Sequence, residues 1–223
     1  MHALTMIQQI TVLLLPVLFA ITVHEAAHGW VAKHLGDRTA ELLGRVSLNP
    51  LRHIDPFGTL LVPLTTFLLT GFLFGWAKPV PITWRNLKRP RRDMALVALA
   101  GPGANLLMGL LWGGGIKLGL LLWNSAQWVA LPLIYMSAAG VLINAVLMVL
   151  NLVPILPLDG GRVLAALLPP RLAYAFSRTE PYGMVLIVVL LMSGLLSRVM
   201  LPTVAFVVGL LPASDIVKEL FLV

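Results

Sequence analysis

Residues 7–32 read IQQITVLLLPVLFAITVHEAAHGWVA, an apolar run with three ionisable side chains near its end. A membrane-spanning helix needs about 20 mostly apolar residues, so this run is long enough to cross a bilayer. Each ionisable side chain in such a helix costs on the order of 2.5–3.5 kcal/mol on insertion scales, and such side chains usually mark function. The stretch therefore predicts a transmembrane helix whose last turns carry a polar site.

The composition of the whole chain also indicates a membrane protein. Hydrophobic residues make up 59% of the 223 residues and charged residues only 11%, whereas soluble domains carry about 25% charged residues. A soluble core of this size cannot bury so much apolar surface, so lipid must solvate much of it. We therefore predict an all-α polytopic membrane protein that forms a single domain over residues 1–223.

The number of membrane crossings depends on one ambiguous stretch, residues 57–76. It lies between two basic segments, and the positive-inside rule places both of these in the cytoplasm. A re-entrant hairpin satisfies that rule where a full crossing does not, and Gly58 and Pro63 permit such a fold-back. We expect five or six transmembrane helices, of which the five clear ones are residues 7–32, 94–123, 129–153, 182–200 and 202–221.

Residues 38–55 and 75–83 resist a helical interpretation because glycine, asparagine and proline interrupt them. We predict extended or turn segments there. Non-helical backbone at membrane depth is tolerated only beside protein or a wet cavity, so we expect these segments near the active site. The basic loops place that site toward the cytoplasm, with the N-terminus outside and, through Lys218, the C-terminus inside.

Two features of the composition exclude other classes of site. The chain has no cysteine, which excludes thiolate zinc ligands and cysteine nucleophiles. Its net charge of +7 comes from basic loops between apolar segments, without the aromatic and basic groove pattern of nucleic-acid-binding proteins. We therefore predict no nucleic-acid partner.

The sequence HEAAH at residues 24–28 has the spacing of a zinc hydrolase. His24 and His28 stand four residues apart, so both imidazoles lie on one helix face and can reach one metal ion. Glu25 then lies near the open side of that metal, where it can act as a general base. The alternative is a structural polar cluster, but three ionisable groups in a membrane helix need a compensating partner, which a metal supplies.

Asp159 is the predicted third ligand, because a catalytic zinc site usually has three protein ligands and one water. Pro154 and Pro157 break the preceding helix, and the glycines after Asp159 allow close backbone approach. The alternative is a loop aspartate paired with Arg162. We interpret the remaining histidines as solvated loop or terminal residues rather than ligands: His2, His34 and His53.

Three motifs together resemble the site-2 protease family of intramembrane zinc metalloproteases, in its compact form without PDZ or CBS modules. They are HEAAHGW at residues 24–30, GPGAN at 101–105 and NLVPILPLDGGR at 151–162. The resemblance implies one Zn2+ ion per chain, and it implies the same residue roles as the spacing: metal ligands His24, His28 and Asp159, and catalytic Glu25.

The resemblance also implies roles in substrate or oxyanion binding for Asn151 and Asn105. Asn151 could equally be a structural amide that bonds a carbonyl freed beside Pro154. These two residues are the tentative members of the predicted site.

The function that follows is that of an intramembrane zinc metalloendopeptidase, which hydrolyses peptide bonds in the transmembrane segments of membrane-protein substrates in regulated intramembrane proteolysis. We expect a multi-pass protein of the inner membrane of a prokaryote, with the lipid bilayer and transmembrane-helix proteins as its partners. The alternative is a metal or ion transporter that uses the same His/Asp cluster, although transport gives Glu25 no task and usually requires related halves. A catalytically inactive scaffold is the third possibility.

Overall fold

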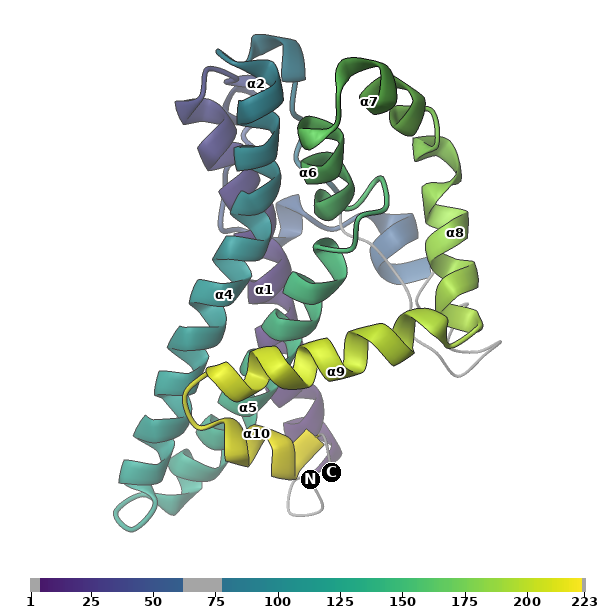
Figure 1. Cartoon of the computed structure of the whole chain (residues 1–223). Helices are drawn as coiled ribbons and strands as arrows, with labels where there is room; N and C mark the ends of the chain where they lie inside the picture. The colour runs from purple at the N-terminus through teal and green to yellow at the C-terminus, as the bar shows by residue number, and fades with distance from the viewer. Residues whose placement is uncertain (1–4, 62–77, 222–223) are drawn as a thin grey trace.

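The computed structural model describes residues 5–61 and 78–221, and all the regular structure within them is helical (Figure 1). The predicted all-α class is therefore confirmed for these residues. In chain order the elements are α1 (Met6–His34), α2 (Thr39–Leu42), η1 (Pro50–Arg52), η2 (Pro56–Leu61), η3 (Trp84–Asn86), α4 (Pro90–Leu122), α5 (Gln127–Asn151), α6 (Asp159–Leu167), α7 (Pro170–Ser177), α8 (Glu180–Met192), α9 (Leu195–Leu210) and α10 (Ser214–Phe221).

Helices α1, α4 and α5 form the centre of the molecule and pack against one another (Figure 1). In the described part of the chain, each of these three is long and apolar enough to cross a membrane. Helices α7 and α8, which bend by 65° at their junction, make a fourth candidate if they act as one broken span. The described residues thus contain three to four candidate spans, fewer than the predicted five or six.

Glycines on α4 allow neighbouring segments to approach its backbone closely. A Cβ atom on Gly119 would lie 2.6 Å from Cγ1 of Ile134 on α5. A Cβ atom on Gly113 would lie 2.9 Å from the carbonyl oxygen of Pro212, in the turn between α9 and α10. Small residues therefore set the helix spacing within this chain, as is common where lipid gives no hydrophobic force between helices.

The C-terminal part of the chain departs from the two spans predicted at residues 182–200 and 202–221. Helix α8 ends at Met192, and Gly194 then adopts a left-handed conformation (φ 73°) that glycine reaches at little cost. Helix α9 lies across the bundle instead of alongside α5, and residues 211–213 separate it from α10 (Figure 1). Neither predicted span is a continuous helix, because turns interrupt sequences that are apolar throughout.

The C-terminal helix also lies at a different end of the bundle from the one predicted. Phe221 packs against a cluster formed by Val12, in the first half of α1, and Ala139 of α5. The charge of Lys218 had predicted a C-terminus on the opposite side from the N-terminus. The apolar face of α10 decides its position instead, since Val217 is fully buried in the main core cluster.

The segments predicted to be extended or re-entrant are described only in part. Residues 62–77 lie outside the described residues, so the question whether 57–76 crosses the membrane lies outside them too. Immediately before them, Pro56–Leu61 forms a short π-helix. Residues 38–55 contain the short helices α2 and η1 separated by turns and bends, and residues 78–83 form neither helix nor strand.

Residues 78–83, here called the strap, are held by two charged side chains that follow α1. The buried carboxylate of Asp37 accepts hydrogen bonds from the N–H of Thr83 (2.7 Å) and from Nδ2 of Asn86 (3.0 Å). At the other end, Nη2 of Arg45 donates to the carbonyl oxygen of Lys78 at 2.9 Å. Both ends of the strap are thus fixed to the segment after α1.

The hydrogen bonds to Asp37 give the fold a dependence on pH. Burial raises the pKa of the Asp37 carboxyl, but donors from Thr39, Thr83 and Asn86 outweigh burial and hold this pKa below its usual range. A carboxyl whose pKa is lower in the folded state contributes stability above its unfolded pKa. That contribution is lost as the pH falls through the folded pKa.

We therefore expect Asp37→Asn to lower stability at neutral pH by about 1–3 kcal/mol, because an amide cannot accept all the bonds that the carboxylate accepts. Thermal unfolding in detergent at neutral and acidic pH measures this. The difference between wild type and variant should shrink in acid. Asp215→Asn, at an exposed position on α10, is the control; equal pH dependence in Asp37→Asn and wild type would contradict the prediction.

Candidate metal centre

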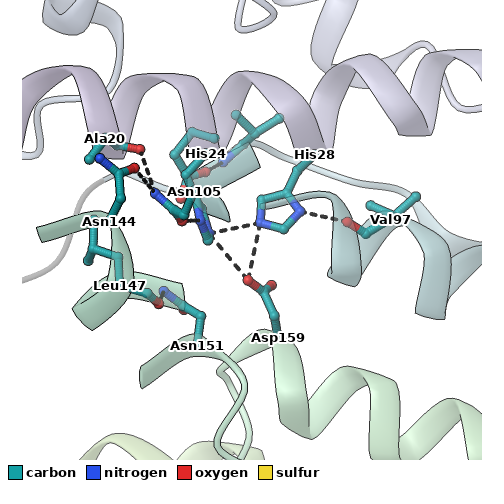
Figure 2. Close-up of polar contacts among 11 residues, drawn as sticks. Ala20, His24, His28, Val97, Asn105, Asn144, Leu147, Asn151 and Asp159 are labelled. Atoms are coloured by element: carbon teal, nitrogen blue, oxygen red, sulfur yellow. Dashed lines mark hydrogen bonds and ion pairs between the residues drawn. The ribbon is translucent and has the colours of Figure 1, made fainter. Parts of the chain in front are cut away.

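Two histidines of α1 and an aspartate of α6 converge on one point inside the helix bundle (Figure 2). The Nε2 atoms of His24 and His28 lie 3.1 Å apart. Oδ2 of Asp159 lies 3.2 Å from the first and 3.3 Å from the second. All three residues are buried, with exposed fractions of 7%, 7% and 9%. In the described part of the chain, no other group of three or more potential ligands is close enough to hold a metal.

The glycine pair after Asp159 explains how its carboxylate reaches α1. Asp159 is the first residue of α6. A Cβ atom on Gly160 would overlap the carbonyl oxygen of Leu152, and one on Gly161 would lie 2.5 Å from the carbonyl carbon of Ile155. Only residues without a side chain let α6 begin so close to the turn that follows α5.

The three ligand atoms have the spacing that a tetrahedral zinc ion requires. Zinc binds imidazole nitrogen and carboxylate oxygen at about 2.0–2.2 Å, so two of its ligands stand about 3.3–3.5 Å apart. The observed separations of 3.1, 3.2 and 3.3 Å are close to that range. Oδ2 of Asp159 is buried and makes no well-oriented hydrogen bond within the described residues, which leaves an acceptor suited to a cation. The residues present therefore fit zinc.

Hydrogen bonds on the far side of each imidazole orient the rings toward this point. Nδ1 of His28 lies 2.7 Å from the carbonyl oxygen of Val97, and Nδ1 of His24 lies 2.5 Å from Oδ1 of Asn105 (Figure 2). A carbonyl oxygen can only accept, so we assign the ring proton to Nδ1 in both histidines. Both Nε2 atoms then carry the lone pair that a metal ligand needs.

One face of α4 supports both histidines. Val97, Gly101 and Asn105 are spaced four residues apart, and so lie along the same side of this helix. A Cβ atom on Gly101 would lie 2.5 Å from Nε2 of His24 and closer still to Nε2 of His28. The glycine therefore keeps open the space where the ligand atoms converge.

Asn144 is a residue of the site that the sequence motifs did not indicate. It is buried on α5, and its Oδ1 accepts from Nδ2 of Asn105 at 2.9 Å. The amide of Asn144 is itself held by the carbonyl oxygen of Gly140 at 2.8 Å. Because Asn105 also donates to Ala20 (3.3 Å), its amide group is fixed with the oxygen toward His24. The signal in the sequence was only a polar residue inside an apolar helix.

Glu25 is held by the strap. Its Oε2 accepts a hydrogen bond from the N–H of Val80 at 2.8 Å. Gly29, one turn further along α1, lets the strap lie close, since a Cβ atom there would lie 3.1 Å from Cγ1 of Val80. The predicted catalytic carboxylate and the strap are thus in direct contact.

The two tentative residues of the predicted site, Asn151 and Asn105, both make hydrogen bonds within the protein. Nδ2 of Asn151 donates to the carbonyl oxygen of Leu147 at 2.9 Å, one turn back on α5 (Figure 2). This contact corresponds to the structural alternative for Asn151, although with a different carbonyl. Asn105 contacts His24, as described above. Roles of either residue in binding substrate or an oxyanion stay predictions.

Among the described residues, the two other histidines, His34 and His53, are not part of the His24, His28 and Asp159 cluster. His34 is exposed and contacts the carbonyl oxygen of Trp30 through Nδ1. His53 is buried rather than solvated, and its Nε2 contacts the carbonyl oxygen of Ser47 at 2.9 Å. His2 lies outside the described residues.

Arg162 forms its ion pair with Glu180, at 2.9 Å, and not with Asp159. Its guanidinium also lies over the ring of Trp84, 5.1 Å from the centroid. These contacts connect α6 to α8 and to η3, and so help to fix the helix that carries Asp159. The alternative in which Asp159 is a loop residue paired with Arg162 does not match this arrangement.

The chain is similar to a described family and to several named proteins. The model of peptidase family M50 matches residues 112–195. A protein of Bacillus subtilis (strain 168) named "Putative zinc metalloprotease YwhC" is 37% identical over 193 residues, which cover 85% of this chain and 84% of that protein. This chain belongs to peptidase family M50. Rip2 of Mycolicibacterium smegmatis, which carries the same description, is 32% identical over 184 residues, or 81% of this chain and 66% of that protein. No solved structure matches the chain.

Membership of family M50 confirms the resemblance to site-2 proteases that the three motifs indicated. With its long apolar helices and its His/His/Asp cluster, the M50 peptidase is a zinc metalloprotease of the membrane. The residues matched by the family model include Asp159 but not the HEAAH segment.

Gly101→Ala should remove zinc from this M50 peptidase without unfolding it, because the new methyl group would occupy the space between the two Nε2 atoms. We expect bound zinc, measured by elemental analysis of the purified protein, to fall about tenfold or more. Gly103→Ala is a matched control on the same helix, since a Cβ atom there meets no heavy atom within 4 Å. Equal zinc content in the two variants would contradict this role of Gly101.

Asn144→Ala should weaken zinc binding about 10- to 100-fold, the range found for partners that orient metal ligands. The change removes an acceptor for Asn105 and lets its amide turn away from His24. Competition with a chromogenic chelator measures the affinity. Asn124→Ala, at an exposed position after α4, should retain the wild-type value. If Asn144→Ala and Asn124→Ala bound zinc with equal affinity, Asn144 would not be needed to orient His24.

Proposed function

We propose that this M50 peptidase cuts peptide bonds within the membrane-embedded segments of protein substrates. The observation that carries the proposal is the position of His24 and His28 on α1, a helix with the length and composition of a membrane span. Together with Asp159 they offer three buried ligand atoms between helices. A hydrolytic site built there would act on substrates that are themselves in the bilayer.

The roles of the residues follow from the chemistry of amide hydrolysis. One zinc ion per chain, held by His24, His28 and Asp159, would supply Lewis-acid activation of water and of the scissile carbonyl. Glu25 would accept the proton of the attacking water and pass it to the leaving amine nitrogen. The N–H of Val80 orients this carboxylate through Oε2.

Substrates of such a site must expose a peptide bond that a helix conceals. In an α-helix each carbonyl oxygen accepts a bond from the N–H four residues later, so local unwinding must come before attack. We therefore expect membrane segments that contain Gly, Pro or Asn to be cut more readily. Regulated intramembrane proteolysis would use this dependence on unwinding to select substrates.

We propose a single-domain, multi-pass protein in the inner membrane of a prokaryote, with its active site toward the cytoplasm. The arrangement of the basic segments supports this orientation. The N–H of Lys88 donates to the carbonyl oxygen of Leu35 at 3.0 Å, which brings the segment before α4 to the end of α1. Basic residues before α4 and after α1 thus gather at one end of the bundle, which the positive-inside rule places in the cytoplasm.

Glu25→Gln should retain zinc and reduce cleavage about 10²- to 10⁴-fold, because it removes the proton acceptor but no metal ligand. The assay is cleavage of a membrane-helix reporter by the purified protein in liposomes, with zinc content measured on the same samples. Glu219→Gln, an exposed glutamate of α10, is the control and should cleave at the wild-type rate.

Two outcomes would contradict this function. Unchanged cleavage by Glu25→Gln would exclude Glu25 as the general base. Transport of a divalent ion by wild type and by Glu25→Gln alike, with no cleavage by either, would favour the transporter alternative instead.

A further inference from the structure

A hollow of about 280 Å³ lies outside the metal centre, between the segment that follows α1 and the start of the strap. Three cationic residues line it: Arg45, Arg52 and Lys78. No carboxylate is among its lining residues. The nearest acidic residue in the sequence, Asp55, uses Oδ1 to accept from the N–H groups of Phe57 and Gly58. The hollow is therefore a concentration of positive charge.

The cations of this hollow retain hydrogen-bonding capacity for a ligand. Arg45 donates through Nη2 to the carbonyl oxygen of Lys78, and Arg52 donates through Nη1 to that of Gly44. Nε of Arg45 is buried without a hydrogen-bond partner in the described residues. Guanidinium groups present several donors in one plane, an arrangement that suits the oxygens of a phosphate.

The surface beside the hollow is apolar. Leu43 and Leu51 line the hollow and are 63% and 74% exposed, and Leu48 nearby in the sequence is 66% exposed. In water, exposing these leucines beside the hollow would be energetically unfavourable. At the edge of a bilayer they would instead contact acyl chains. A ligand that matches both parts has a negative headgroup and a hydrocarbon tail.

We infer that this hollow binds the phosphate headgroup of an anionic phospholipid, with the acyl chains lying along Leu43 and Leu51. The hollow is separate from the metal centre, but the strap borders the hollow and also contacts Glu25. Arg45 lines the hollow and also holds Lys78, two residues before the N–H of Val80 that contacts Glu25. A bound headgroup would therefore help to keep the strap in position.

The test compares lipid retention by the intact protein in nanodiscs that contain phosphatidylcholine with a minor share of phosphatidylglycerol. Wild type should retain phosphatidylglycerol on extraction into detergent, as counted by native mass spectrometry. The double variant Arg52→Gln/Lys78→Gln should retain about 10- to 30-fold less, since each basic residue near an anionic membrane surface contributes about 1 kcal/mol. Arg171→Gln/Arg178→Gln removes the same charge from two exposed positions, one on α7 and one directly after it, and should behave as wild type.

Several results would overturn the inference. Equal loss of lipid in both double variants would indicate attraction to net charge rather than a site. Equal retention of phosphatidylcholine and phosphatidylglycerol by wild type, which needs no variant, would exclude recognition of an anionic headgroup. Complete displacement of phosphatidylglycerol by inorganic phosphate would show that the hollow binds free phosphate and that the leucines contribute nothing.

Discussion

Two imidazole nitrogens and a carboxylate oxygen meet inside an apolar helix bundle, and this convergence constrains the elements around it. A buried carboxylate without a cation costs several kcal/mol, so the helices must together create a place for a positive ion. Helix α4 accepts the Nδ1 protons of both histidines, which turns their lone pairs toward Asp159. Helix α6 delivers the carboxylate, and two glycines allow it to begin beside the turn after α5.

The carboxylate of Glu25 is held by a different part of the chain from the three predicted metal ligands. Its hydrogen-bond donor, the N–H of Val80, belongs to the strap, which Asp37 and Arg45 attach to the segment after α1. The strap therefore positions the proposed base, while α1 and α6 position the three potential ligand atoms. Changes in the strap can in this way move the Glu25 carboxylate without any contact with His24, His28 or Asp159.

The sequence predicted the candidate site well where ionisable side chains in an apolar helix required a partner to offset their cost in lipid. HEAAH and Asp159 predicted the metal cluster because their cost in lipid requires a common partner. The apolar runs after residue 180 were less informative, since hydropathy does not distinguish a straight helix from one interrupted at Gly194 or at residues 211–213. Asn144 was missed for another reason. An isolated amide in a helix has no motif, and its role depends on a contact 39 positions away in the sequence.

The four-residue spacing of Val97, Gly101 and Asn105 on α4 has a consequence for how this protein can change in length. Each residue added to an α-helix rotates everything beyond it by about 100°. An insertion or deletion between Val97 and Asn105 would therefore carry at least one of the three away from the histidines, with no loop nearby to absorb the change. The turn between α4 and α5 has no such restriction, because a change in its length leaves the positions of Val97, Gly101 and Asn105 relative to the histidines unaltered.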